Sequence, residues 1–164
     1  MKNYEAILNR LVQMGWTVDR LPQPKPLPEE ILKRYPAIPA DYRELIESLG
    51  LVTSPERTAW LVTGGIISGE CKIAFAWNEW EIQSLDAAGK DGAWATSIRQ
   101  FWDHHFPLLM SVKSGYAYFA LDLTASNVVQ GEEPEYEEVS PLAPTIAEMF
   151  RMVIDKDPSI EAWV

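Results

Sequence analysis

Apolar residues recur along the chain in two patterns, one typical of helices and one typical of strands. The points where the pattern changes mark the boundaries of the predicted helices and strands. Where a helix is expected, apolar side chains recur every three or four residues. The first such stretch has Tyr4, Leu8 and Leu11 on one stripe. Asn3 is placed to cap this helix and Gly15 to end it. The periodicity predicts helices at about residues 4–14, 29–35, 40–49, 79–88, 94–105 and 145–156.

The ends of the later helices are marked by glycine, proline and capping residues. Gly50 and Gly89 are expected to end the third and fourth helices, because glycine adopts the backbone conformation that closes a helix. Pro107 is expected to close the fifth helix. The last helix begins near Thr145, with Glu148 three residues later, which is the pattern of a capping box.

Shorter stretches rich in β-branched and aromatic residues predict strands. Strands are expected at residues 58–62, 72–77, 108–113 and 116–121, with short edge strands at 127–130 and 136–139. Ser114-Gly115 is typical of a β-hairpin turn, and Gly64-Gly65 of a bend between strands. The order of elements favours an α+β fold. We expect a mostly antiparallel (mixed) sheet with helices packed around it, on one face in the simplest arrangement.

A proline-rich strap follows the first helix. Prolines alternate with other residues from Pro22 to Pro28, which forbids a helix and favours an extended polyproline II segment. We therefore divide the chain into residues 1–26, an N-terminal helix and strap, and residues 27–164, the main α+β unit. Its 164 residues fit one compact domain overall.

Charge and composition exclude several classes of function. Lys and Arg number 14 against 24 Asp and Glu, which gives a net charge of −10. Direct nucleic-acid binding is not expected, because it depends on basic residues that neutralise phosphates. An acidic surface suits a basic protein partner, although charge also simply maintains solubility. The single cysteine, the absence of a signal-peptide pattern and the lack of a long apolar run predict a soluble, cytoplasmic protein without a membrane span.

Residues able to do chemistry are few. His104 and His105 are adjacent, so on a helix they would point about 100° apart and could not share a metal ion. Cys71 has no partner in sequence for a redox or zinc motif. Asp122 follows a predicted strand and is expected to be a turn residue. We assign no catalytic, cofactor-binding or metal-binding residue, and expect no cofactor and no enzymatic activity.

A glutamate-rich segment is the clearest surface feature. Five of the seven residues from Glu132 to Glu138 are glutamate, which predicts either a solvated loop or a binding face for a basic protein. Tryptophans in the central part either belong to the core or line a groove, and exposed tryptophan is frequent at protein-binding hot spots. The predicted partner-binding residues are Glu132, Glu133, Glu135, Tyr136, Glu137, Glu138, Trp77 and Trp80.

Several segments together resemble the SUKH superfamily, which includes the Smi/Knr cell-wall regulators and many bacterial proteins. The residues 27–30 (LPEE) and 38–46 (IPADYRELI) are similar to its opening helices. Residues 107–122 resemble its central hairpin, and residues 145–150 (TIAEMF) its closing helix. The resemblance covers roughly residues 27–154. It implies a SUKH-like α+β fold without shared catalytic residues.

The resemblance also implies a function. Bacterial members bind and neutralise toxins, often nucleases, so we expect an immunity protein that covers a basic toxin with its acidic face. One alternative is a regulatory scaffold of the Smi/Knr type. Another is a small-ligand-binding protein or enzyme that uses Trp77, Trp80, Trp94 and Trp102 together with His104, His105 or Asp122.

Overall fold

The computed structural model describes residues 2–164, with side chains from Tyr4 onward, so the predicted cap at Asn3 lies outside the described side chains. Its strands form one seven-stranded sheet in which every neighbouring pair is antiparallel and the order in space is the order in sequence. The strands are β1 (Thr17–Arg20), β2 (Leu49–Thr53), β3 (Ala59–Leu61), β4 (His105–Ser111), β5 (Ala117–Asp122), β6 (Asn127–Glu132) and β7 (Ser140–Ala143).

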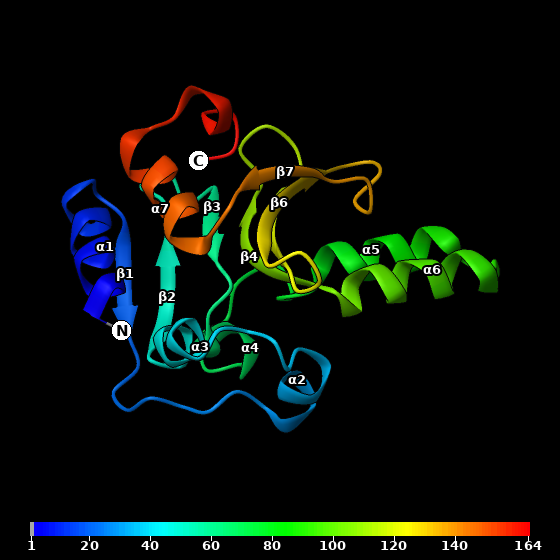
Figure 1. The fold of residues 1–164 in the computed structure, drawn as a ribbon, viewed down its shortest axis with the longest axis horizontal. Coiled ribbons are helices and arrows are strands. Elements are labelled where there is room, and N and C mark those ends of the chain that lie inside the picture. The colour runs from blue at the N-terminus through cyan, green and yellow to red at the C-terminus, as the bar shows by residue number, and fades with distance from the viewer. Residues whose placement is uncertain (1) are drawn as a thin grey trace.

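Helices surround this sheet, and the α+β class with an antiparallel sheet is confirmed. In Figure 1, α1 and α7 lie on the side of β1 and β2, α2, α3 and α4 lie at one end, and α5 and α6 extend away as a pair. The helices are α1 (Lys2–Gln13), α2 (Glu29–Arg34), α3 (Ala40–Glu47), α4 (Gly64–Ile67), α5 (Glu79–Ala88), α6 (Gly92–Asp103) and α7 (Ile146–Asp155), followed by a 3-10 turn at Pro158–Ile160.

The central hairpin of β4 and β5 is confirmed, and it is covered on both faces. Successive side chains of a strand point to opposite faces. Tyr118 packs against Trp102 of α6, with ring centroids 4.9 Å apart. Its neighbour Phe119 packs against Trp163 of the C-terminal segment, at 5.8 Å. Helix α6 therefore covers one face of the hairpin and the C-terminal segment the other, and this burial explains why both strands are almost continuously apolar.

Two strands in the N-terminal half of the chain, β1 and β2, were not predicted. Strand β1 follows α1, and β2 begins at Leu49, directly after the cap of α3 at Ser48. Gly50 therefore lies inside a strand and does not end the helix. Gly64-Gly65 begins the short helix α4, where a bend was expected. A Cβ atom on Gly65 would lie 2.7 Å from the Cα of Gly50, so glycine allows this helix to approach the sheet closely.

Three other predictions at this level are wrong. Residues 72–77 form no strand; their alternate side chains Phe75 and Trp77 pack on the aromatic core without a ladder of hydrogen bonds. Residues 136–139 are a loop, and β7 lies just beyond them, so β6 is not an edge strand. Helix α6 ends at Asp103, so His105 and Pro107 lie in β4, where the register shift next to Pro107 accommodates the missing N–H.

The N-terminal segment belongs to the same sheet and core as the rest of the chain. Strand β1 pairs with β2, and Tyr4 of α1 packs against Phe150 of α7 with ring centroids 6.2 Å apart. The proline strap joins β1 to α2 and contains no helix or strand. It is held at α3, where the backbone N–H of Lys25 donates to the Glu47 carbonyl oxygen at 2.9 Å.

Candidate functional site

The loop between β6 and β7 carries the glutamate-rich segment, and we call residues 132–138 the acidic loop. Glu132, Glu133, Glu135 and Glu138 are exposed, and Glu137 is half-buried. The loop lies beside the α5–α6 pair (Figure 1). Four carboxylates of this one loop therefore face solvent. These four members of the predicted partner-binding set lie on the surface.

Tyr136 anchors the acidic loop from the inside. It is buried, and its ring stacks on Trp80 of α5 with centroids 5.5 Å apart and planes 8° from parallel. Its hydroxyl donates to Gln83 Oε1 at 3.0 Å, and its backbone carbonyl accepts a hydrogen bond from the Tyr118 hydroxyl. Burial raises the pKa of the Tyr136 hydroxyl well above its usual value, and the nearby Glu133 carboxylate adds to the rise.

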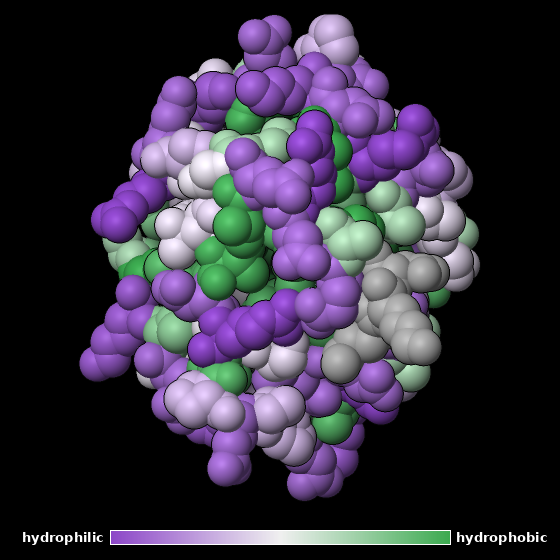
Figure 2. Space-filling view, turned by 90° about the vertical axis from the view of Figure 1, so that its left-hand side faces the viewer, coloured by the Kyte–Doolittle hydropathy of each residue, from purple (hydrophilic) through white to green (hydrophobic). Residues whose placement is uncertain are grey.

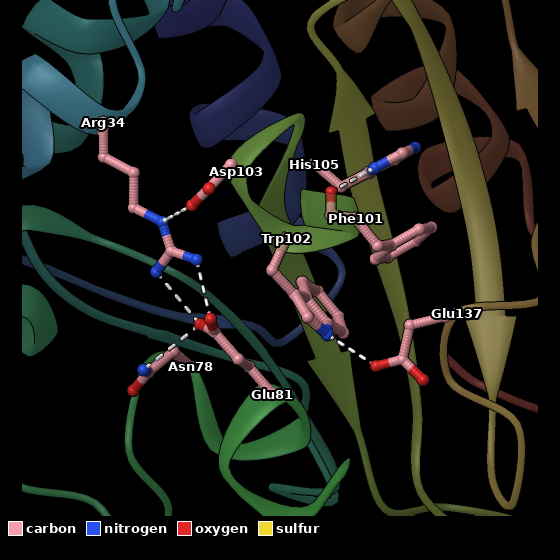
Figure 3. Close-up of polar contacts among 8 residues, drawn as sticks. All are labelled: Arg34, Asn78, Glu81, Phe101, Trp102, Asp103, His105 and Glu137. Carbon is pink, nitrogen blue, oxygen red and sulfur yellow. Dashed lines mark hydrogen bonds and ion pairs between the residues drawn. The ribbon is translucent and has the colours of Figure 1, made fainter. Parts of the chain in front are cut away.

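Glu137 provides a second anchor. Trp102 Nε1 of α6 donates to Glu137 Oε1 at 2.7 Å, as Figure 3 shows. Trp102 is itself buried in the core, so this bond ties a loop carboxylate to a fixed indole ring. With Tyr136 held on α5 and Glu137 on α6, the loop keeps one arrangement relative to both helices.

A groove of about 620 Å³ lies between the acidic loop and the α5–α6 pair. Trp94, near the start of α6, forms part of its wall and is 47% exposed. The helix begins at this point because Asp91 Oδ1 accepts a hydrogen bond from the Trp94 backbone N–H at 3.0 Å. The groove is lined by Gln83, Ser84, Ala87, Trp94, Glu133, Pro134, Glu135, Tyr136, Glu137 and Glu138.

The structure separates the two predicted tryptophans from this groove. Trp80 is 1% exposed and supports the loop from within, so it presents no surface to a partner. Trp77 is half-buried against Tyr35 and lines a different hollow, beside Ile73 and Phe75. Trp94 does line the groove, but it was named only for the small-ligand alternative and is absent from the predicted partner-binding set. The buried stripe of α6 runs through Ala95, Ile98 and Trp102, and Trp94 lies outside it. The helical spacing of these residues could therefore have predicted that Trp94 is exposed.

An ion-pair network fixes the position of α5 and α6 relative to α2. Arg34 donates to both carboxylate oxygens of Glu81, at 2.6 and 3.0 Å, and to Asp103 Oδ1 at 2.8 Å (Figure 3). The Glu81 side chain is only 6% exposed. A buried carboxylate needs such pairing, because an unpaired buried charge is strongly destabilising. The network is therefore part of the frame that holds the groove.

The residues considered as candidates for catalysis or metal binding differ in burial, and only some of them lie close together. His104 caps α6 and is exposed, whereas His105 is half-buried in β4 and faces Asp122 across the ladder to β5. Asp122 is also a turn residue, as predicted, since its Oδ1 accepts from the N–H groups of Thr124 and Ala125. Cys71 is half-buried and far along the chain from both histidines.

Two features are absent from residues 2–164, a metal-binding cluster and a membrane-spanning helix. Within these residues, no group of three or more His, Cys, Asp and Glu side chains is placed to hold a metal ion. In the same residues, no helix combines the length and apolarity that crossing a membrane requires.

Comparisons with known proteins identify no relative of the chain. No family model matches it, and neither curated proteins nor solved structures give a significant match.

Proposed function

We propose that this chain is a non-catalytic protein-binding domain that docks a basic surface of its partner in the groove beside the acidic loop. The observation that carries this proposal is the combination of a half-exposed tryptophan with a row of exposed glutamates in one groove. Trp94 stands on the helical wall, and Glu135 and Glu138 stand on the loop wall. Tryptophan is enriched among the residues that dominate binding energy at protein interfaces.

Charge supports a basic partner. The whole chain carries −10, and the acidic loop concentrates part of that charge next to the groove. Complementary potentials speed association and exclude partners of the wrong sign. The same charge opposes direct contact with nucleic acid, whose phosphates would be repelled.

The rigidity of the loop also supports docking. A loop that becomes ordered only on binding loses affinity to the entropy of ordering. Here the acidic loop is already held by the Trp80–Tyr136 stack and by the Trp102–Glu137 hydrogen bond. The partner therefore meets a surface that needs little rearrangement.

The class of partner follows from the resemblance to the SUKH superfamily. We propose an immunity protein of the cytoplasm that occludes the active face of a basic toxin, such as a nuclease, since nuclease surfaces that hold nucleic acid are basic. A regulatory scaffold of the Smi/Knr type would use the same groove for a basic partner that is not a toxin.

Binding of the full chain to the product of the adjacent upstream gene tests the proposal, measured by biolayer interferometry. Trp94→Ala should weaken binding by about thirtyfold, since truncating a hot-spot residue costs about 2 kcal/mol or more. Glu138→Lys should slow association, whereas Glu30→Lys, an equal charge change on exposed α2, should not. No binding, or equal effects of the two lysine variants, would contradict the proposal. Binding of the expected kind by a non-toxic product would favour the scaffold.

A further inference from the structure

His105 and Asp122 bring two metal-binding types of side chain together at a site separate from the groove. They lie directly opposite each other in the β4–β5 ladder. His105 Nε2 is 3.8 Å from Asp122 Oδ2, which is too long for a hydrogen bond. Both side chains are largely buried, with 13% and 20% exposed, and they line a pocket of about 520 Å³ together with Gln100, Phe101, His104 and Thr124.

The imidazole of His105 is held with one nitrogen free. Its Nδ1 lies 2.7 Å from the Phe101 carbonyl oxygen, and a carbonyl oxygen only accepts, so Nδ1 carries the proton. The ring also stacks on the Phe101 ring, with centroids 3.9 Å apart and planes 7° from parallel. In the neutral ring, the lone pair is therefore on Nε2, the atom that faces Asp122.

The carboxylate of Asp122 is held in the same manner. Its Oδ1 accepts two hydrogen bonds, from the backbone N–H groups of Thr124 at 2.8 Å and Ala125 at 3.0 Å. Oδ2 makes no hydrogen bond to any residue in the described part of the chain. Each side chain is thus fixed through one polar atom, and the two remaining donor atoms converge.

We propose that His105 Nε2 and Asp122 Oδ2 bind a divalent transition-metal ion of the zinc type, with water completing its coordination. Zinc takes imidazole nitrogen and carboxylate oxygen at about 2.0–2.2 Å, so two such donors at a tetrahedral angle lie about 3.4 Å apart. A small closing movement of the observed pair meets that distance.

The surroundings of the pair match those of a metal ligand set. Metal-binding histidines donate their other ring N–H to a carbonyl or carboxylate, and binding carboxylates are themselves hydrogen-bonded. The Phe101 carbonyl and the Thr124 and Ala125 amides fill these roles. Two protein donors are fewer than structural zinc sites use, so the ion would be exchangeable.

Zinc titration of the full chain by isothermal calorimetry, after chelator treatment and gel filtration, tests this site. The parent chain should bind one zinc ion. Asp122→Asn should weaken binding at least about tenfold. It retains an oxygen for the Thr124 and Ala125 amides, so the turn and the fold are kept, which circular dichroism verifies. Asp86→Asn, at an exposed position on α5, removes the same charge and should change nothing.

A nuclear magnetic resonance readout keeps the test independent of heat signals. At a zinc concentration that half-saturates the parent chain, the His105 Nε2 resonance should shift clearly in the parent and much less in Asp122→Asn. The proposal is overturned if the parent chain shows no saturable binding at millimolar zinc. It is also overturned if folded Asp122→Asn binds as tightly as the parent, because the carboxylate would then not be a ligand.

Discussion

The indole N–H of Trp102 lies 2.7 Å from a carboxylate oxygen of Glu137, so a core residue of α6 holds the acidic loop in place. Trp102 also packs on Tyr118, whose hydroxyl bonds the backbone carbonyl of Tyr136. The loop that we propose as the binding surface is thus fastened to the interior at two consecutive residues. Its charge faces solvent while its position is set by the core.

Trp102→Phe should destabilise the protein, because it removes the donor to Glu137 and leaves unfilled volume in the core. A hydrogen bond to a charged group contributes about 1.5–3 kcal/mol, and we expect the free energy of unfolding to fall by at least that amount. Urea denaturation followed by circular dichroism measures this. Trp94→Phe, at the exposed tryptophan, serves as the matched control and should leave the midpoint unchanged. Equal midpoints for the Trp102 variant and the parent would show that the bond contributes nothing.

Arg34→Met should be more damaging than loss of a surface ion pair. It would remove both Arg34 hydrogen bonds from the buried Glu81 carboxylate and leave only the 3.5 Å contact with Asn78 Nδ2. Breaking a buried pair costs about 3–5 kcal/mol. Arg151→Met removes an exposed arginine from its pair with Glu148 and should change stability within experimental error. Chemical denaturation of both variants compares them. Similar small effects would mean that solvent reaches Glu81.

Gly131→Ala should disturb the anchor of the acidic loop. A Cβ atom at this position of β6 would lie 2.7 Å from the hydroxyl of Tyr118, which is fully buried and cannot move aside. Overpacking of this kind costs about 1–3 kcal/mol. Gly92→Ala is the control, since its Cβ would meet open space, and it should leave stability unchanged or slightly higher. Thermal melts distinguish the two, and a neutral Gly131 variant would contradict the packing described.

Alkaline pH should unfold the protein as the unfolded tyrosines ionise. Burial raises the pKa of Tyr4 to about 12, and it raises those of Tyr42 and Tyr118 further. Between the unfolded value of about 10 and the folded value, the native state holds more protons, so stability falls as pH rises. Each such tyrosine removes about 1.4 kcal/mol per pH unit in that window.

Tyrosinate absorbance and circular dichroism, recorded together from neutral to alkaline pH, check this expectation. The absorbance of the buried tyrosines should rise only with the loss of the native spectrum. If all tyrosines ionised near pH 10 while the native spectrum persisted, the burial described would be wrong.

The elements that the sequence predicted well are those with a local cause. Ser114-Gly115 supplies the turn of the central hairpin, and Gly115 has a φ of 110°, which other residues rarely adopt. Thr145 caps α7 by accepting from the Glu148 N–H at 3.1 Å, although the Glu148 carboxylate pairs with Arg151 and does not complete the capping box. Such local turn and helix patterns were enough to predict an antiparallel sheet.

The elements that were missed depend on tertiary contacts. Residues 72–77 alternate as a strand does, but β3 is already paired with β2 and β4, so this segment finds no partner in the ladder. Strands β1 and β2 are short and stand next to helices, where helical periodicity concealed them. His105 was placed on a helix because α6 and β4 join within two residues, and its approach to Asp122 depends on that switch.

Only one wall of the candidate groove, the acidic loop, could be predicted from the sequence. The acidic loop stands out by composition, but its neighbours come from α5 and α6, about fifty residues earlier, so no local pattern relates them. Burial of Trp80 and Tyr136 also could not be read from residue type, because both tryptophan and tyrosine occur in cores and at interfaces.

The face of the molecule on the side of α1 is mostly hydrophilic, with hydrophobic side chains gathered near its middle (Figure 2). Strand β1 forms the outer edge of the sheet on this flank, and α1 packs beside it. A shortened chain that began at residue 27 would lack both, so the sheet edge would pass from β1, which carries Asp19 and Arg20, to the apolar strand β2. The core that Tyr4, Leu8 and Leu11 help to form would also be uncovered. Apolar unpaired edges and exposed apolar patches both promote aggregation. Removal of residues 1–26 should therefore increase self-association, which size-exclusion chromatography of the full and shortened chains would measure.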